Sequence, residues 1–159
     1  MSIQSNKLSF KYKQGPALSF PDINLKTSEN LLILGQSGKG KSTLLHLLAG
    51  LIKPSSGSIM IGNTIISDLK AGAIDRYRGN NIGLVFQRAH FVKSLSIKNN
   101  LLLTQKLAGA QQDIKLVESV LEQVNIAHKM NSKSNQLSIG EQQRASIARA
   151  LINNPELIL

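Results

Sequence analysis

Alternating apolar positions indicate β-structure in the first part of the chain. Residues 3–12 and 18–25 carry apolar or aromatic side chains at mostly alternate positions, with Gly15-Pro16 between them. This pattern predicts two strands joined by a turn. The run 31–34 is continuously apolar, which predicts a strand covered on both faces.

Three further β-segments are predicted downstream. Apolar segments on either side of Gly62-Asn63 predict a hairpin at 58–66, because these two residues adopt the backbone angles of a tight turn. The apolar segment 82–86, which ends at Gln87, predicts another buried strand. Residues 157–159 resemble the opening of one more strand.

Helical spacing of apolar side chains marks four other segments. A leucine stripe follows the glycine-rich segment 35–40, and Gly50 with Pro54 ends it. The second half is mainly helical, with Ser96 placed as the N-cap of one helix. The predicted helices lie at about 41–49, 96–108, 114–124 and 138–152.

Composition and charge narrow the possible functions. The net charge is +10, from 19 basic and 9 acidic residues. The basic residues are spread along the chain, with Lys11 and Lys13 as one close pair, so we expect no nucleic-acid partner. The absence of cysteine excludes disulfides and thiolate metal sites. No apolar segment is long enough to span a membrane, and the amino terminus lacks a signal-peptide pattern, so we expect a cytoplasmic chain.

The segment 35–43 carries the most specific motif. It fits G-x-x-x-x-G-K-[ST] and lies between a predicted strand and a predicted helix. Such a loop points backbone amides at phosphate oxygens, and the helix adds its positive end. Lys41 is expected to reach the β- and γ-phosphates, and Ser42 to offer its hydroxyl to Mg²⁺. The candidate nucleotide-binding residues are Gly35, Gln36, Ser37, Gly38, Lys39, Gly40, Lys41, Ser42 and Thr43.

A second motif opens the last predicted helix. Ser138 followed three residues later by Glu141 forms a capping box. Capping explains these two residues but leaves Gly140 unexplained, because glycine is a poor helix former. An uncovered helix N-terminus also attracts anions. We therefore predict that this turn contacts a phosphate in addition to capping the helix.

Together these motifs resemble the nucleotide-binding subunit of an ATP-binding-cassette (ABC) transporter. The resemblance covers nearly the whole chain, and it is carried by segments 35–43, 85–87, 137–144 and 147–151. The stretch 77–87, with 95–97 after it, most resembles the branch that serves lipoprotein release and macrolide export. The family resemblance has structural consequences. It implies an α/β fold with the P-loop NTPase core of an ABC ATPase: an antiparallel β subdomain, a parallel sheet with the P-loop helix, and a helical subdomain.

The resemblance also implies roles for single residues. Gln87 is expected to be the Q-loop glutamine, which holds Mg²⁺ and the attacking water. Ser138 and Gly140 are expected to touch the γ-phosphate of ATP held by the other subunit of a head-to-tail dimer. Tyr12 is expected to stack on adenine, with Phe10 as an alternative. The catalytic candidates are thus Gln87 and Lys41, and the metal candidates Ser42 and Gln87.

Two departures from the family pattern affect these expectations. The usual Leu-Ser-Gly-Gly-Gln has Ile139 and Glu141 in its third and fifth positions here. The capping box is expected to turn Glu141 back toward its own helix. The Walker B aspartate and catalytic glutamate would come after Leu159, so for the chain as it stands we expect ATP binding with negligible hydrolysis.

The expected function is ATP-driven transport with a transmembrane permease, by a subunit that binds ATP and Mg²⁺ and dimerises with itself or a paralogue. The expected location is the inner face of the cell membrane. We expect a β subdomain with P-loop core at about 1–90, a helical subdomain at about 91–137, and the signature helix with the start of the Walker B strand at 138–159. The alternatives are a non-hydrolysing nucleotide-binding fragment and a DNA-repair or chromosome-type ABC ATPase.

Overall fold

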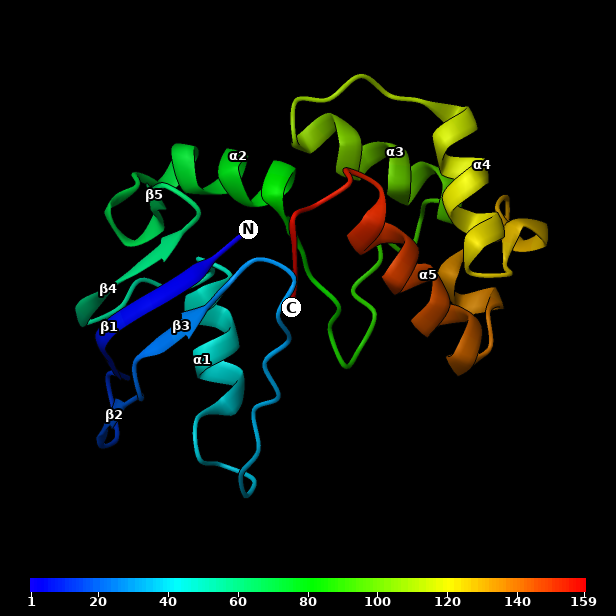
Figure 1. Ribbon diagram of the computed structural model, residues 1–159. Coiled ribbons are helices and arrows are strands. Elements are labelled where there is room, and N and C mark those ends of the chain that lie inside the picture. Colours follow the sequence, from blue (N-terminus) through cyan, green and yellow to red (C-terminus); the bar gives the residue numbers. More distant parts are fainter. The chain divides into compact units, whose positions relative to one another are not determined.

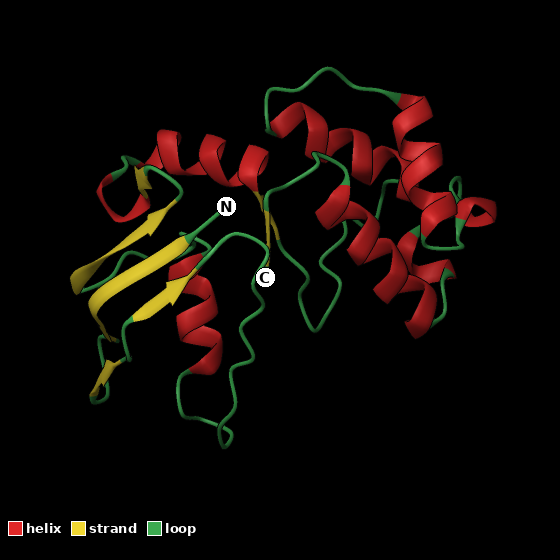
Figure 2. Cartoon of the chain, viewed as in Figure 1, coloured by secondary structure: helices red, strands yellow, loops and turns green.

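The computed structural model describes all residues, 1–159. The chain forms two compact units, residues 1–74 and 75–159, and Figures 1 and 2 show their helices and strands. Each unit is described by itself below.

Unit 1–74 is built on an antiparallel sheet in which β1 is the central strand. It pairs with β2, β3 and β4, and β4 pairs in turn with β5. The alternation in the sequence explains the burial, since Ile3, Leu8, Ile59 and Ile61 are all buried. The strands are β1 (Ile3–Lys11), β2 (Ala17–Ser19), β3 (Ile23–Leu25), β4 (Ser56–Ile61) and β5 (Thr64–Ile65).

The predicted strand pairs of this unit are largely confirmed. The segment predicted as a single strand at 18–25 is divided into β2 and β3, because Phe20-Pro21-Asp22 lie outside the strand ladder and proline cannot donate a ladder hydrogen bond. The hairpin forms where Gly62-Asn63 predicts it, and Gly62 adopts a φ of 58°.

The leucine stripe forms helix α1 (Lys41–Leu48), whose Leu44, Leu47 and Leu48 are buried. A short 3₁₀ turn, η1 (Ile66–Asp68), comes after the hairpin. Helix α2 (Ala71–Asn81) comes next and leads into the second unit.

The prediction of a strand at 31–34 is wrong. No strand pairs with these residues, and Figure 2 draws the segment as a loop between β3 and α1. The side chains of Leu31, Leu32 and Leu34 are 48%, 79% and 80% exposed. An apolar run predicts a buried strand only where neighbouring strands provide hydrogen bonds and cover both faces, and here neither condition is met.

Unit 75–159 is mainly helical, as predicted. Its buried core joins one face of each long helix with the loop residues Ile126 and Leu137. The elements are β6 (Ile82–Gly83), α3 (Ile97–Leu107), α4 (Ile114–Gln123), η2 (Ala127–Lys129), η3 (Ser134–Gln136), α5 (Ile139–Leu151) and β7 (Leu157–Ile158).

The helix starts of this unit result from local capping. Ser96 Oγ accepts a hydrogen bond from the amide of Asn99, at 3.2 Å, and Asp113 caps α4 through the amide of Leu116, at 3.1 Å. These contacts satisfy amides that a helix start leaves without an internal partner. The predicted boundaries at Ser96 and Ser138 are confirmed.

The strand predicted at 82–86 is shorter than expected. Only Ile82 and Gly83 form β6, which pairs in parallel with β7. One further bond lies beyond it, from the amide of Val85 to the carbonyl of Leu159, at 2.9 Å. The chain from 84 to 86 is only half-buried, so the apolar run is longer than the partner strand that pairs with it.

Candidate functional site

The phosphate loop in unit 1–74 takes its shape from glycine. Gly38 and Gly40 have φ angles of 81° and 88°, a region that side chains with a Cβ rarely adopt. At Gly40 space is also short, because a Cβ there would lie 3.1 Å from Leu18 Cδ1. Gly40 is the N-cap residue of α1, so the loop turns directly into the helix at this point.

The amides at the start of α1 have no side-chain cap. The N-cap Gly40 offers no acceptor, and the first turn contains no acidic residue. The positive end of the helix dipole therefore meets no negative charge from its own first turn. A phosphate at this position would receive backbone N–H donors that no side chain of this turn uses.

Lys41 lies across the loop. Its Nζ donates hydrogen bonds to the carbonyl oxygens of Gly35 and Gln36, each at 2.7 Å. An ammonium group has three protons to donate, so the two carbonyls hold the charge over the loop and leave one donor for a ligand. Lys39 is exposed and makes no comparable side-chain contact.

Tyr12 lies beside the loop and is 48% exposed. Its hydroxyl shares a hydrogen bond with Thr43 Oγ1, at 2.9 Å, and its ring meets Phe10 edge to face with centroids 4.7 Å apart. Tyr12 but not Phe10 lines a cavity of about 510 Å³. The other walls of that cavity are Gln14, Gly15, Pro16, Leu18, Ser37, Gly38, Gly40, Lys41, Ser42 and Thr43.

The residues that line this cavity are of the types that bind a nucleoside triphosphate. It combines an aromatic ring, an ammonium group, two hydroxyl residues at the start of a helix and glycine backbone. No cluster of three or more His, Asp or Glu occurs in the chain. Ser42 is the hydroxyl residue of this set that would ligate a Mg²⁺ ion bound together with the phosphates, a common arrangement for this ion. The donor chemistry fits that arrangement.

The second candidate site, at the start of α5 in unit 75–159, is a complete capping box. The carboxylate oxygen Glu141 Oε2 accepts hydrogen bonds from Ser138 N at 2.8 Å and Ser138 Oγ at 2.9 Å. In return, Ser138 Oγ accepts from the amide of Glu141 at 3.3 Å. The predicted turn of Glu141 toward its own helix start is confirmed.

Electrostatics keep this carboxylate ionised. The hydrogen bonds from the Ser138 backbone and hydroxyl, and after them the nearby charge of Lys129, lower the pKa of Glu141 from 4.5 to about 2. Lys129 Nζ lies 3.5 Å from Glu141 Oε1. Meanwhile Ile139 is 86% exposed and Gly140 is exposed too, so this helix end presents backbone at the surface.

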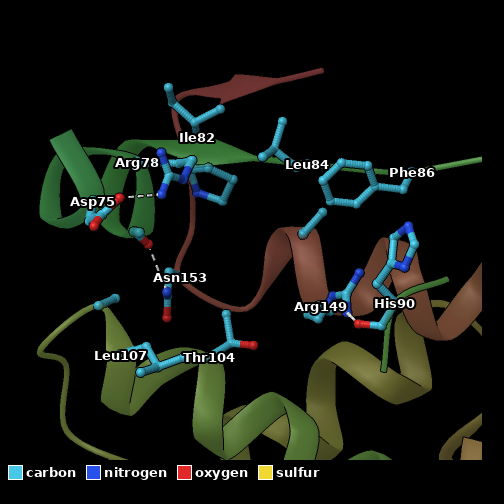
Figure 3. A pocket seen from close by; sticks show the side chains of 14 residues that line it. Asp75, Arg78, Ile82, Leu84, Phe86, His90, Thr104, Leu107, Arg149 and Asn153 are labelled. Atoms are coloured by element: carbon cyan, nitrogen blue, oxygen red, sulfur yellow. Dashed lines mark hydrogen bonds and ion pairs between the residues drawn. The ribbon is translucent and has the colours of Figure 1, made fainter. Parts of the chain in front are cut away.

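Gln87 lies in a loop after β6, with its side chain exposed. The rings of Phe86 and His90, on either side of that loop, meet edge to face with centroids 5.4 Å apart. Arg149 from α5 donates a hydrogen bond to the carbonyl oxygen of His90 (Figure 3). Phe86, His90 and Arg149 line a cavity of about 630 Å³ within this unit.

The structure thus groups part of the predicted site within each unit. Unit 1–74 brings Tyr12 together with the phosphate loop, and unit 75–159 contains Gln87, Ser138 and Gly140. The sequence does not point to Gln14, Pro16 or Leu18 as cavity residues. Their only signal is a position shortly after Tyr12. No helix of the chain has the length and apolar character needed to cross a membrane.

The sequence of this chain is similar to those of ATP-binding proteins of ABC transporters. The sequence model of the family described as "ABC transporter" matches residues 18–159. The lipoprotein-releasing system ATP-binding protein LolD of Idiomarina loihiensis is 36% identical, over 99% of this chain and 72% of that protein. An uncharacterized ABC transporter ATP-binding protein of Mycobacterium tuberculosis, Rv0986, is also 36% identical, over 99% of this chain and 66% of that protein.

Solved structures agree with these relatives. The ATP-binding cassette MJ0796, in a dimeric post-hydrolysis state with ADP and Pi, matches with a TM-score of 0.88 and 34% identity, over 98% of this chain and 72% of that one. The subunit cbiO1 of Clostridium perfringens, part of the ABC transporter complex cbiONQ, matches with a TM-score of 0.81 and 30% identity, over 98% and 63%.

Proposed function

Because the chain belongs to the ABC transporter family, as an ATP-binding subunit that couples ATP hydrolysis to transport, we propose that residues 35–43 hold the triphosphate of ATP. The observation that carries this assignment is the position of Lys41. Its ammonium is held over the loop by two carbonyls, next to a helix start that no side chain caps. Both features favour a multiply charged anion.

The neighbouring residues are assigned by their contacts. Tyr12 lines the same cavity as the loop and offers its exposed ring to the adenine base, since aromatic rings bind bases by stacking. Its hydroxyl is bonded to Thr43, which fixes the ring relative to the loop. Phe10 supports Tyr12 from the side and does not line the cavity.

Magnesium is assigned to Ser42 and Gln87. A bound Mg²⁺ would supply the positive charge that offsets the negative charge on the phosphates during transfer of the γ-phosphate. Ser42 offers a hydroxyl from the first turn of α1. Gln87 offers an amide oxygen from an exposed loop position, and we assign this carboxamide to the metal and to orienting the attacking water.

Ser138 and Gly140 are assigned to the nucleotide of a second subunit. The start of α5 is exposed, and its carboxylate is turned back onto its own cap. Glu141 partly offsets the positive end of this helix, but its carboxylate is hydrogen-bonded to Ser138, so the exposed backbone at Gly140 stays open to a phosphate. The dimeric MJ0796 cassette is consistent with pairing of two subunits.

The partner and the transported substrate are assigned from the relatives. LolD proteins of several bacteria match over 99% of the chain. We therefore propose a transmembrane permease as partner, lipoprotein release or a related export as the process, and a peripheral position at the inner face of the membrane. Gln87 and its loop are the part expected to respond to the permease.

Calorimetric titration of the purified protein with ATP and with AMP tests the phosphate-loop assignment. AMP retains the base and one phosphate, so we expect ATP to bind about 100-fold more tightly, or better, because several charge-assisted hydrogen bonds are lost with the β- and γ-phosphates. Equal affinity for the two nucleotides would contradict the assignment.

A further inference from the structure

The loop that carries Gln87, residues 87–91, is closed by a contact between two aromatic rings. Phe86 precedes Gln87 and His90 lies three residues after it, and their rings meet edge to face at 5.4 Å. Contacts of this type stabilise beyond the area that they bury. Gln87 itself is exposed. The backbone between the two rings therefore forms a short closed loop. Its orientation depends on the contacts made by its carboxyl-terminal residues, His90 and Phe91.

Arg149 contacts both His90 and Phe91. Its guanidinium donates a hydrogen bond to the His90 carbonyl oxygen (Figure 3), and it lies over the ring of Phe91 with 4.7 Å between the guanidinium carbon and the ring centroid. A planar guanidinium can do both at once, whereas an ammonium group lacks the flat face for stacking. Two consecutive residues of the loop are thus fixed by one side chain.

The charge of Arg149 has no carboxylate partner. None of the ion pairs in the chain includes it, and burial lowers the pKa of its guanidinium. An arginine nevertheless stays protonated in proteins. Removing a cation from water is costly, so its placement against a carbonyl and a ring indicates a role in fixing backbone geometry.

Arg149 belongs to the helix that begins at Ser138. Helix α5 runs from Ile139 to Leu151 and buries Ala145 and Ala148 in the core of the unit. The backbone hydrogen bonds of the helix are internal, so it links Arg149 to Ser138 through one continuous element. The contact at Arg149 therefore ties the Gln87 loop to the same element that carries the signature serine.

We propose that Arg149 is a positioning residue for Gln87: it fixes the loop 87–91 on helix α5, so that the Gln87 carboxamide and the Ser138 end of the helix move as one body. This inference rests on the proposed roles of Gln87 and Ser138. It predicts that loss of the guanidinium loosens the loop and weakens the contribution of Gln87 to the binding of Mg²⁺-loaded ATP, while the phosphate loop still binds the nucleotide.

The first test measures the mobility of the loop. The chain has no tryptophan, so Arg88→Trp, at an exposed loop position, provides a single fluorescent reporter. In that background we compare Arg149→Met, Arg149→Lys and the control Arg76→Met, an exposed arginine of α2. Thermal unfolding verifies that each variant is folded.

Time-resolved anisotropy then reports the motion of the loop directly. We expect Arg149→Met to increase the nanosecond motion of the reporter, because the hydrogen bond to the His90 carbonyl oxygen and the stacking on Phe91 are both lost. Arg149→Lys should restore part of the restraint, and Arg76→Met should leave the anisotropy unchanged. An unchanged loop in folded Arg149→Met would overturn the inference.

The second test is a double-mutant cycle with Gln87→Ala, which removes the carboxamide. The readout is the ratio of ATP affinity with Mg²⁺ to ATP affinity with a chelator, measured by calorimetry. We expect Gln87→Ala and Arg149→Met each to lower this ratio, and Arg149→Met to have no further effect once Gln87 is removed. Independent, additive effects would overturn the inference, because contacts that act through one another are not additive.

The two tests separate this inference from the proposed function. If Gln87→Ala lowers the ratio and Arg149→Met does not, the function stands and the positioning role is wrong. If Gln87→Ala leaves the ratio unchanged, the proposed role of Gln87 is wrong, and the positioning role falls with it even where the loop is visibly anchored.

Discussion

The two units hold their candidate residues by different means. In unit 1–74 the phosphate loop is shaped by glycine backbone angles and by a lysine that bonds to the carbonyls of its own loop. In unit 75–159 the candidate residues are placed by side-chain contacts, through the capping box at Ser138 and through Arg149. We therefore expect substitutions in the first unit to affect nucleotide binding directly, and those in the second to affect dimerisation and the Mg²⁺-dependent part of ATP binding.

The largest effect is expected from Lys41→Ala. Removing the ammonium deletes the cation that is bonded across the loop, and we expect ATP affinity to fall about 100-fold or more, since hydrogen bonds to charged groups are the strong ones. Calorimetry against Lys53→Ala, a lysine of the same unit outside the loop, controls for net charge. Unchanged ATP affinity in Lys41→Ala would contradict the role of the Lys41 ammonium in holding the phosphates.

Ser138→Arg tests the other side of the comparison. We expect near-normal ATP binding by the monomer and loss of ATP-induced dimers, measured by sedimentation, because a bulky cation replaces the contact at the exposed start of α5. Loss of the cap itself costs about 1 kcal/mol, which thermal unfolding measures separately. Asn131→Arg, at an exposed position, is the control. Loss of binding by the monomer would place Ser138 in the wrong role.

A smaller effect is expected at Tyr12. Tyr12→Ala removes the stacking ring, and we expect ATP affinity to fall about tenfold, within the range measured for one stacked base. Tyr12→Phe keeps the ring and loses only the bond to Thr43, so its loss should be smaller. Phe10→Leu should leave affinity unchanged, and a larger effect there than at Tyr12 would reverse the assignment of the two aromatic residues.

The smallest effect concerns acid stability. The pKa of Glu141 is about 2 in the folded chain, against an ordinary 4.5. A lowered pKa stabilises the fold above the unfolded value and loses that contribution as the pH falls through the folded one. We expect the wild type to lose this contribution between pH 4.5 and 2, and Glu141→Gln to lack it. Glu118→Gln, exposed on α4, should behave like the wild type in thermal unfolding across that range.

The sequence predicts local features of the fold well. Helix starts at Ser96 and Ser138 and the hairpin at Gly62 depend on residues within a few positions of each other, so the chemistry is visible in a short window. The fold class is confirmed by the solved cassette structures. The domain boundaries near 90 and 137 stay predictions.

Non-local pairing limits what the sequence predicts. The run 31–34 and the segment 84–86 carry strand composition, but a strand needs a partner. Helix α2 is absent from the sequence-based prediction, because it buries no side chain and contains Gly72 and Gly79, so it has no apolar stripe to recognise.

The site shows the same division between local and distant contacts. The phosphate loop and the capping box are contiguous motifs, so the sequence alone places them as candidates. Arg149 meets His90 across 59 positions, and no pattern in the sequence indicates that meeting. The bond between Tyr12 and Thr43, 31 positions apart, is equally absent from any short window.

The central claim is that backbone amides around Lys41 hold the phosphates of ATP. Residue-resolved hydrogen exchange of 36–43, with and without saturating ATP, tests it most directly. We predict strong protection of these amides by ATP in the wild type and none in Lys41→Ala. Unchanged exchange across the loop, in a protein that binds ATP by calorimetry, would contradict the account.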